Sequence, residues 1–328
     1  MASAYNDPQL HGLVRTMLKQ MPASFINGED EDKTKDWSTA ALLRTIDHTL
    51  LTQASPMEII TLCTTAHRAQ TATVCVNSNM IPFAVASLQQ IYKDASPEQQ
   101  QQHRVVPIAV VGFPFGASNT AGKVAETIQA IQDGAQEIDM VVAISYLRAG
   151  LYSYVLNDIS AVVQAARSAR PSAAAAAEIP VKVILETANL TTDQIATSSL
   201  LACLAGAAFI KTSTGYAQPP LLEGRPLGAR VEDVRLMAWV TDYHHQTFLS
   251  EAGSAQQKVK VKASGGIGSA AALRQMLNAG ANRIGASRTE TIAKELISAD
   301  ATGSSSDASA VPAPATAPSS SSSSSDAY

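Results

Sequence analysis

Eight short apolar runs rich in Val and Ile recur along the chain, separated by longer segments of helical character. The runs expected to form strands span 42–49, 71–77, 105–113, 137–144, 181–187, 207–214, 258–265 and 282–287. Several are almost continuously hydrophobic, which is typical of parallel strands covered on both faces. Eight strand and helix units in about 260 residues predict an α/β fold, a (β/α)8 TIM barrel. An open doubly wound sheet is the alternative.

Two segments flank the predicted barrel. Residues 1–39 form an N-terminal helical extension, with a helix expected around 8–20. Residues 299–328 consist mainly of Ser, Ala, Pro and Thr. Such a segment buries too little apolar surface to offset the entropy of ordering, so a disordered C-terminal tail is predicted. The barrel domain is then 40–298.

Composition narrows the class of function. Hydrophobic residues make up 46% of the chain and the formal net charge is -4, with no basic stripe. This argues against nucleic acid or a membrane surface as the partner and favours small-molecule chemistry. The three cysteines are far apart without metal-like spacing, so neither a disulfide framework nor a metal site is expected. No apolar run approaches the about 20 residues that span a bilayer, and a cytoplasmic location is expected.

Two lysines stand near the ends of predicted strands, Lys211 in "AAFIKTSTGY" and Lys262 in "KVKVKASGG". A lysine taken singly at such a place is usually a structural ion pair or a solvated tip. Two ammonium groups in a partly dry site lower each other's proton affinity, so one can be a neutral nucleophile near pH 7. Lys211 is the candidate Schiff-base nucleophile and Lys262 its electrostatic activator. Asp139 is the candidate proton shuttle, with a purely structural pairing as the alternative.

The turns after the last two strands carry glycines. Gly265 and Gly266 lie in "ASGGIG", and Gly285 and Ser287 lie in "RIGAS". Glycine turns after strands seven and eight of a barrel often bind phosphate through backbone N–H groups. They are also ordinary in loops. Lys260, two residues before Lys262, is expected at the opposite, solvent-exposed mouth of the barrel.

The order of the motifs resembles the deoxyribose-phosphate aldolase family. The matching segments are "TIDHTLL", "VCVN", "VVGFPFG", "EIDMVV", "VKVILET", "FIKTSTG", "VKASGGI" and "RIGAS", over roughly residues 40 to 295. The resemblance implies a class I aldolase on a (β/α)8 barrel that needs no metal or organic cofactor. It implies reversible cleavage of 2-deoxy-D-ribose 5-phosphate to D-glyceraldehyde 3-phosphate and acetaldehyde.

The resemblance also assigns residues. It makes Lys211 the Schiff-base lysine, Lys262 its paired lysine and Asp139 the proton-relay aspartate. It further implies a set of substrate contacts and one more catalytic group at the end of the chain, the phenol of Tyr328, which would deliver a proton to the enamine. The implied substrate-binding residues are Asp47, Thr49, Cys75, Thr214, Gly215, Gly265, Gly266, Gly285, Ser287 and Arg288.

The phosphate end departs from the family pattern at three positions. Tyr216 stands where a lysine is common, Gly268 where an arginine is common, and Arg288 where a second serine is frequent. The loss of two cations leaves the side chain that binds phosphate unassigned, with Arg288, Arg225 and Arg230 as candidates.

Two other functions fit the same fold. A sugar-phosphate isomerase or epimerase would use the phosphate turns and a carboxylate or histidine base, for which His48 is the one histidine at a predicted strand end. A non-catalytic metabolite-binding barrel would recruit partners through its tail. Phosphosugar and aldehyde substrates are the expected partners, and a homodimer is the expected assembly if the inserted loops permit it.

Overall fold

The computed structural model describes residues 5–23, 25, 31–94, 96, 104–169, 178–219, 221–222, 225–250 and 257–302. Predictions that fall elsewhere, those for Tyr328 and the tail beyond 302 among them, lie outside these residues.

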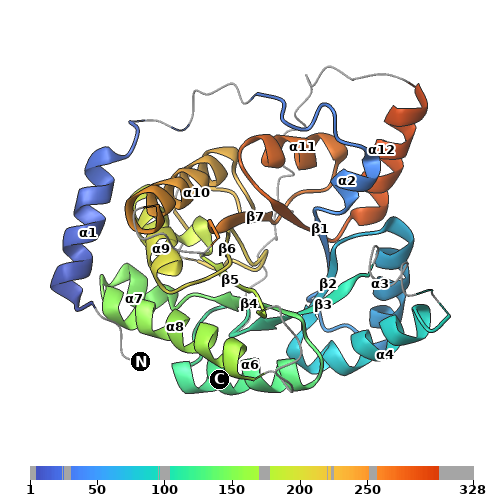
Figure 1. Ribbon diagram of the computed structural model, residues 1–328, viewed down its shortest axis with the longest axis horizontal. Helices are drawn as coiled ribbons and strands as arrows, with labels where there is room; N and C mark the ends of the chain where they lie inside the picture. Colours follow the sequence, from blue (N-terminus) through green and yellow to red (C-terminus); the bar gives the residue numbers. More distant parts are fainter. Residues whose placement is uncertain are drawn as a thin grey trace, which may run out of the picture.

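Eight parallel strands close into a barrel in chain order, ringed by helices (Figure 1). The strands are β1 (Ile46–Thr49), β2 (Thr73–Asn77), β3 (Val106–Val111), β4 (Glu137–Val141), β5 (Val181–Ile184), β6 (Phe209–Lys211), β7 (Lys260–Ser264) and β8 (Arg283–Ala286). The (β/α)8 prediction is confirmed. Because β1 pairs with both β2 and β8, an open sheet is excluded.

The helices of the described residues cover the outside of the barrel. They are α1 (Asp7–Gln20), α2 (Thr39–Leu43), α3 (Pro56–Ala69), α4 (Ile81–Ile91), α6 (Thr120–Gln132), α7 (Ile144–Arg148), α8 (Tyr152–Ser168), α9 (Thr192–Leu204), α10 (Val231–His244), α11 (Ala270–Asn278) and α12 (Thr289–Thr302). A π-helical turn (His245–Leu249) extends α10. Ser55 and Thr191 begin α3 and α9 with capping boxes, so sequence-local hydrogen bonds define where these helices start.

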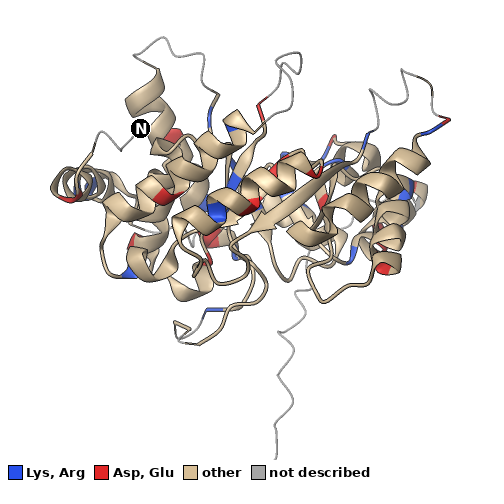
Figure 2. Ribbon diagram, turned by 90° about the horizontal axis from the view of Figure 1, so that it is seen from below, with Lys and Arg blue, Asp and Glu red and all other residues tan. Residues whose placement is uncertain are grey.

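The two faces of the strands have different chemistry. Outward side chains such as Val74, Val76 and Ile210 join the main hydrophobic core between strands and helices. Inside the barrel, a small apolar cluster centres on Cys75, Ile108 and Val110 of β2 and β3. The basic and acidic side chains described below fill the rest of the interior. In the side view of Figure 2, blue and red segments lie next to one another on the central strands.

The first predicted strand begins too early. The prediction started at residue 42, but Leu42 and Leu43 belong to α2, which Ser38 caps through its hydroxyl. A short apolar run has no periodicity that separates a strand from a buried helical turn, which explains the error. The predicted strands at 181–187 and 207–214 are also too long, because the strands end at Ile184 and Lys211 and only single backbone hydrogen bonds, such as Leu185 N–H to Lys211 O, continue beyond them.

The predicted N-terminal helix is confirmed as α1. Its buried Leu10, Val14 and Met17 face the barrel, and the helix packs against α8 and α9 (Figure 1). At the other end, α12 continues to Thr302, so residues 299–302, the first four of the predicted tail, are helical.

Candidate active site

Lys211 and Lys262 lie opposite one another on β6 and β7, and both point at a carboxylate on β4. Their Cα atoms are partners in the strand register. Lys211 Nζ lies 2.9 Å from Asp139 Oδ2, and Lys262 Nζ lies 2.8 Å from the same oxygen. All three side chains are buried. The structure therefore brings together the three residues that the sequence singled out.

A third lysine, Lys182 on β5, shares the same carboxylate. Its Nζ lies 2.8 Å from Asp139 Oδ1 and 2.5 Å from Glu137 Oε2. The sequence interpretation missed Lys182, although it carries the same signal as Lys211, a lysine within an apolar run. Phe209 lies below, with the ammonium groups of Lys182 and Lys260 each 5.8 Å from its ring centroid. Lys260 is exposed at this end, as predicted.

Asp47 on β1 completes the network from the other side. Its Oδ2 lies 2.5 Å from Lys262 Nζ, and its Oδ1 accepts hydrogen bonds from Arg283 Nη1 at 2.8 Å and Thr73 Oγ1 at 2.7 Å. Asp47 is fully buried, so these protein groups surround its carboxylate. Arg283, at the start of "RIGAS", was also missed.

The three lysines differ in how many carboxylates each contacts. Lys262 has Asp47 and Asp139, and Lys182 has Glu137 and Asp139. Within the described chain, Lys211 has an ion pair with Asp139 alone. The interior network as a whole contains four basic side chains, Lys182, Lys211, Lys262 and Arg283, and three acidic ones, Asp47, Glu137 and Asp139. Of the three lysines, Lys211 therefore has the fewest carboxylates to offset the positive charge of its neighbours.

This asymmetry separates the pKa values. Burial lowers the pKa of Lys211, and the charge of Lys262 lowers it further against the opposing effect of Asp139. Burial also disfavours the charged form of Lys262, but Asp139 and Asp47 outweigh it, so its pKa is raised. Burial is likewise outweighed at Lys182, whose pKa is raised by Asp139 and Glu137. Of the three lysines named here, Lys211 is the one whose pKa is lowered from its ordinary value.

Asp139 stays ionised. Burial raises the pKa of its carboxyl, but the charges of Lys182, Lys211 and Lys262 outweigh that effect and hold the pKa well below its ordinary value. A carboxylate beside the Lys211 amine can hold a hydrogen-bonded water through which a proton passes.

Thr214 and Gly215 follow β6 and contact the turn after β5. Thr214 Oγ1 donates to Glu186, and the Thr214 N–H points at the same carboxylate. Glu186 has φ of 60°, an uncommon backbone conformation for a residue with a side chain, and its pKa is raised by burial. Gly215 is exposed with φ of 85°, which favours glycine.

The predicted phosphate turns differ in their surroundings. Gly266 has φ of 77° and open space where a Cβ would be, whereas a Cβ on Gly265 would lie 2.9 Å from Gly228 Cα. A Cβ on Gly285 would lie 2.8 Å from Ser264 Cβ and 3.3 Å from Lys262 Cε. The missing side chain of Gly285 thus makes room for Lys262.

Ser287 and Arg288 are exposed after β8. They line a cavity of about 360 Å³ together with Thr49 and His48. Arg288 also passes over Gly268, where its Cδ would lie 3.0 Å from a Cβ. The guanidinium of Arg288 therefore occupies space that a larger residue at 268 would need, which connects two of the departures from the family pattern.

Thr49 and Cys75 lie at the edge of the network. Thr49 Oγ1 donates to the backbone oxygen of Asp47 at 2.8 Å. Cys75 is buried with Ile108 and Val110, and burial together with the charge of Asp139 raises the pKa of its thiol to about 11. Cys75 is thus a neutral, apolar wall of the interior.

No group of His, Cys, Asp and Glu side chains within the described residues is arranged to hold a metal ion. In the same part of the chain, none of the helices has the length and apolar character needed to cross a membrane.

A closed parallel barrel with buried amines near the carboxyl ends of its strands is the architecture of a class I aldolase. A family model described as DeoC/LacD family aldolase matches residues 41–305. The chain belongs to this family.

Named relatives agree with the family. Deoxyribose-phosphate aldolase from Carboxydothermus hydrogenoformans is 38% identical over 264 residues, which cover 80% of this chain and 98% of that protein. A crystal structure from Coccidioides immitis, described as a candidate deoxyribose-phosphate aldolase, has a TM-score of 0.70 and 32% identity, covering 90% of this chain and 99% of that one. The tetrameric deoxyribose phosphate aldolase from Aeropyrum pernix shares the fold, with a TM-score of 0.60 and 24% identity over 80% of this chain and 93% of its own.

Proposed function

We propose that this aldolase cleaves 2-deoxy-D-ribose 5-phosphate reversibly to D-glyceraldehyde 3-phosphate and acetaldehyde, as a step of deoxyribonucleoside catabolism. The observation that carries the proposal is the pair of buried lysines, Lys211 and Lys262, whose Nζ atoms lie 2.9 and 2.8 Å from one oxygen of Asp139. The pKa of Lys211 is lowered and that of Lys262 is raised, which supports Lys211 as the nucleophile. The substrate follows from the names of the relatives and from the glycine turns after β7 and β8.

The neutral amine of Lys211 attacks C1 of the open-chain sugar, and loss of water gives a protonated imine. The imine withdraws electrons while a base takes the proton of the C3 hydroxyl. The C2–C3 bond then breaks and glyceraldehyde 3-phosphate leaves. The electron pair of the broken bond stays with C2, which leaves an enamine on Lys211. Protonation at C2 and hydrolysis of the imine release acetaldehyde and restore the amine.

The neighbouring charges have separate roles in this proposal. Lys262 keeps its proton and favours the neutral form of Lys211, while Asp139 orients the water that carries protons to and from the intermediates. Asp47 holds Lys262 in place from the opposite side. The N–H groups of the turns that contain Gly266 and Ser287, with the exposed guanidinium of Arg288, would bind the phosphate.

The isomerase or epimerase alternative needs a base in the interior. His48 is the histidine at a strand end, but it alternates with the inward Asp47 and therefore faces outward. Its Nδ1 lies 2.8 Å from Thr289 Oγ1 of α12. Burial lowers the pKa of His48 in that position. This placement removes His48 from the candidate bases of the alternative, and nothing in the comparisons favours that alternative.

Borohydride trapping tests the proposal. The protein is incubated with 2-deoxyribose 5-phosphate or acetaldehyde, reduced, digested and mapped by mass spectrometry. We expect an adduct at Lys211, absent from a Lys211→Met variant. Lys258, an exposed lysine paired with Asp242, controls for unspecific modification. An adduct at Lys262 instead would reverse the two roles, and absence of any specific adduct would reject the Schiff-base mechanism.

Two further parts of the proposal, the role of Tyr328 and the homodimer, have tests of their own. Tyr328 would protonate the enamine, so its deletion should slow exchange of solvent deuterium into C2 while leaving adduct formation at Lys211 intact. A homodimer would appear as twice the chain mass in light scattering. Cytoplasmic location is supported by the three cysteines, which are all unpaired and buried, as in proteins of reducing compartments.

A further inference from the structure

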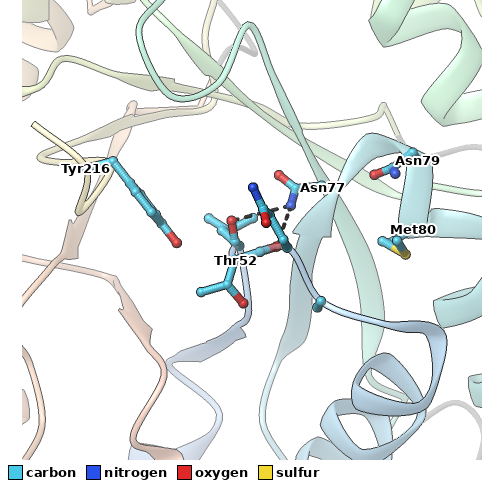
Figure 3. A pocket seen from close by; sticks show the side chains of 8 residues that line it. Thr52, Asn77, Asn79, Met80 and Tyr216 are labelled. Carbon is cyan, nitrogen blue, oxygen red and sulfur yellow. Dashed lines mark hydrogen bonds between the residues drawn. The ribbon is translucent and has the colours of Figure 1, made fainter. Parts of the chain in front are cut away.

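The loop that joins β6 to α10 has different neighbours at its two ends. At its start, Tyr216 lines a cavity of about 790 Å³ and directs its phenol toward Thr52 (Figure 3). That cavity is the mouth of the active site described above. At the other end of the loop, Gly228 and Ala229 lie against Gly265, in the glycine turn after β7. The roles assigned so far do not use Gly228 and Ala229.

Gly228 approaches the turn so closely that no side chain fits between them. A Cβ on Gly228 would collide with the carbonyl oxygen of Gly265 and lie 2.6 Å from its carbon and 3.2 Å from Gly266 N. A Cβ on Gly265 would in turn lie 2.9 Å from Gly228 Cα. These neighbours are backbone atoms, which cannot rotate away as the end of a flexible side chain can. Glycine at both positions is therefore what allows the loop and the turn to pack together.

Ala229 fixes the orientation of the turn. Its N–H donates to the carbonyl oxygen of Gly265 at 3.1 Å. In a planar trans peptide, the N–H of the following residue points in the direction opposite to the carbonyl. Because the Gly265 carbonyl faces the loop, the Gly266 N–H faces away from it. The peptide between these two glycines cannot turn over without breaking the hydrogen bond to Ala229.

The Gly266 N–H is open to a ligand. Gly266 is exposed, and a Cβ there would meet nothing within 4 Å. Within the described part of the chain, this N–H has no protein acceptor. An anion gains a hydrogen bond from such a donor, whereas the carbonyl oxygen that a turned-over peptide would present repels it. The direction of one peptide therefore decides whether this turn attracts phosphate.

The loop is held in place by α10. Arg225 Nη1 lies 3.0 Å from both carboxylate oxygens of Asp233, and the Arg225 side chain is only 10% exposed. The same nitrogen lies 3.4 Å from the backbone oxygen of Thr187, in the turn after β5. Protein contacts thus set the position of the loop before a ligand binds, which lowers the cost of ordering the turn on binding.

We propose that Gly228 and Ala229 are positioning residues for phosphate recognition. They hold the Gly265–Gly266 peptide with its carbonyl toward the loop and its N–H toward the open space, and neither of them needs to contact the substrate. The enzyme thereby favours a sugar that carries a phosphate over the same sugar without one. The inference rests on the proposed function, since it assumes that the turn after β7 receives the phosphate.

The test is a Gly228→Ala variant, in which kcat/KM is measured for 2-deoxyribose 5-phosphate and for unphosphorylated 2-deoxyribose. The new Cβ must displace the peptide between Gly265 and Gly266. We therefore expect the ratio of the two kcat/KM values to fall about tenfold, through a higher KM for the phosphorylated sugar. The value for 2-deoxyribose should change by less than about twofold. A ratio within about twofold of the parent's, equal losses for both sugars included, overturns the inference.

The matched control is Gly280→Ala, which introduces similar crowding at the amino end of the barrel. Gly280 lies between α11 and β8, and a Cβ there would lie 2.7 Å from Ala238 Cβ. This variant should keep the parent's ratio, because it does not touch the turn after β7. A fall of the ratio in the control as large as in G228A would show that crowding anywhere has this effect, and would overturn the inference.

Amide hydrogen exchange in the parent is a second measurement, which needs no variant. The Ala229 N–H should exchange slowly because it is hydrogen-bonded, and saturating inorganic phosphate should slow exchange of the Gly266 N–H. Rapid exchange at Ala229, or no effect of phosphate at Gly266, overturns the inference.

Borohydride trapping of acetaldehyde at Lys211 in the parent is read separately from both measurements. Failure of trapping rejects the proposed function. Successful trapping with an unchanged ratio in G228A rejects the positioning role alone.

Discussion

Lys211 and Lys262 share a single oxygen, Asp139 Oδ2, at 2.9 and 2.8 Å. They occupy equivalent positions on neighbouring strands, and yet their pKa values move in opposite directions. The difference arises from Asp47, which contacts Lys262 and not Lys211. A second carboxylate on one lysine thus separates the pKa values of the two amines, and in the proposed mechanism the amine with the lowered pKa is the nucleophile.

Replacing Lys182 by Met should lower kcat at least about tenfold while changing KM less. Lys182 holds Asp139 Oδ1, so its loss frees the carboxylate to turn away from Lys211, and small displacements of a reacting group are costly. Steady-state kinetics provide the measurement. Lys260→Met is the matched control, because Lys260 lies over the same Phe209 ring but is exposed. A variant with the parent's kcat would show that Lys182 does not position Asp139.

Replacing Gly285 by Ala should lower activity by about ten- to a hundredfold. The new Cβ would lie 2.8 Å from Ser264 Cβ and 3.3 Å from Lys262 Cε, so Ser264 must shift and Lys262 must adjust its position, and small displacements of a group in the site are costly. Gly12→Ala is the control, since a Cβ there meets nothing within 4 Å. If G285A is as active as the parent with an unchanged pH profile, the close approach of Gly285 to Lys262 has no functional consequence.

Much of this fold could be predicted from the sequence, for a physical reason. Parallel strands covered on both faces favour apolar residues on both, so a strand such as Val106–Val111 leaves a continuous apolar run in the sequence. Strand ends were harder to predict. Glu186 and Thr214 lie beyond their strands, where the side chains contact each other and not the sheet. Local sequence does not encode such contacts between loops.

The site was predicted only in part. Lys211, Lys262 and Asp139 were predicted because charged residues within apolar runs are conspicuous and the family motifs contain all three. Lys182 was missed although its partner Asp139 lies directly beside it on the neighbouring strand, because the apolar run alone does not show which strands pair. Arg283 was missed because its partner Asp47 lies on β1, and only closure of the barrel between β1 and β8 brings the two together. The cavity beside Tyr216 was not predicted at all, since it is formed by loops of three separate strands.

Replacing Asp158 by Asn should destabilise the protein by about 3–5 kcal/mol, because it leaves the buried ammonium of Lys123 without its carboxylate. Lys123 Nζ lies 2.6 Å from Asp158 Oδ2, and both side chains are inaccessible to solvent. Denaturant unfolding checks this. The control is Asp242→Asn, which breaks the exposed pair with Lys258 and should cost within about 1 kcal/mol. Equal losses in the two variants would contradict the structural role of the buried pair.

The parent's activity should rise with pH through a midpoint below the ordinary lysine pKa of about 10.4. Lys211 must be neutral to attack, and a lowered pKa increases the neutral fraction at every pH below that midpoint. Single-turnover imine formation at Lys211, followed against pH, gives the midpoint directly. A midpoint at or above the ordinary value would show that burial and Lys262 do not favour the neutral amine.

Replacing Lys262 by Leu should shift that midpoint upward and lower the rate at pH 7 by at least about a hundredfold. The variant removes a positive charge that lowers the pKa of Lys211, so Asp139 then favours the protonated amine without opposition from Lys262. Part of the activity should return at high pH, where Lys211 loses its proton. Lys262→Arg separates charge from shape, because it keeps the positive charge and should keep the midpoint near the parent's even if its rate is lower. Parent-like activity of K262L at pH 7 would make Lys262 a structural residue, and the neutral amine of Lys211 would then depend on burial alone.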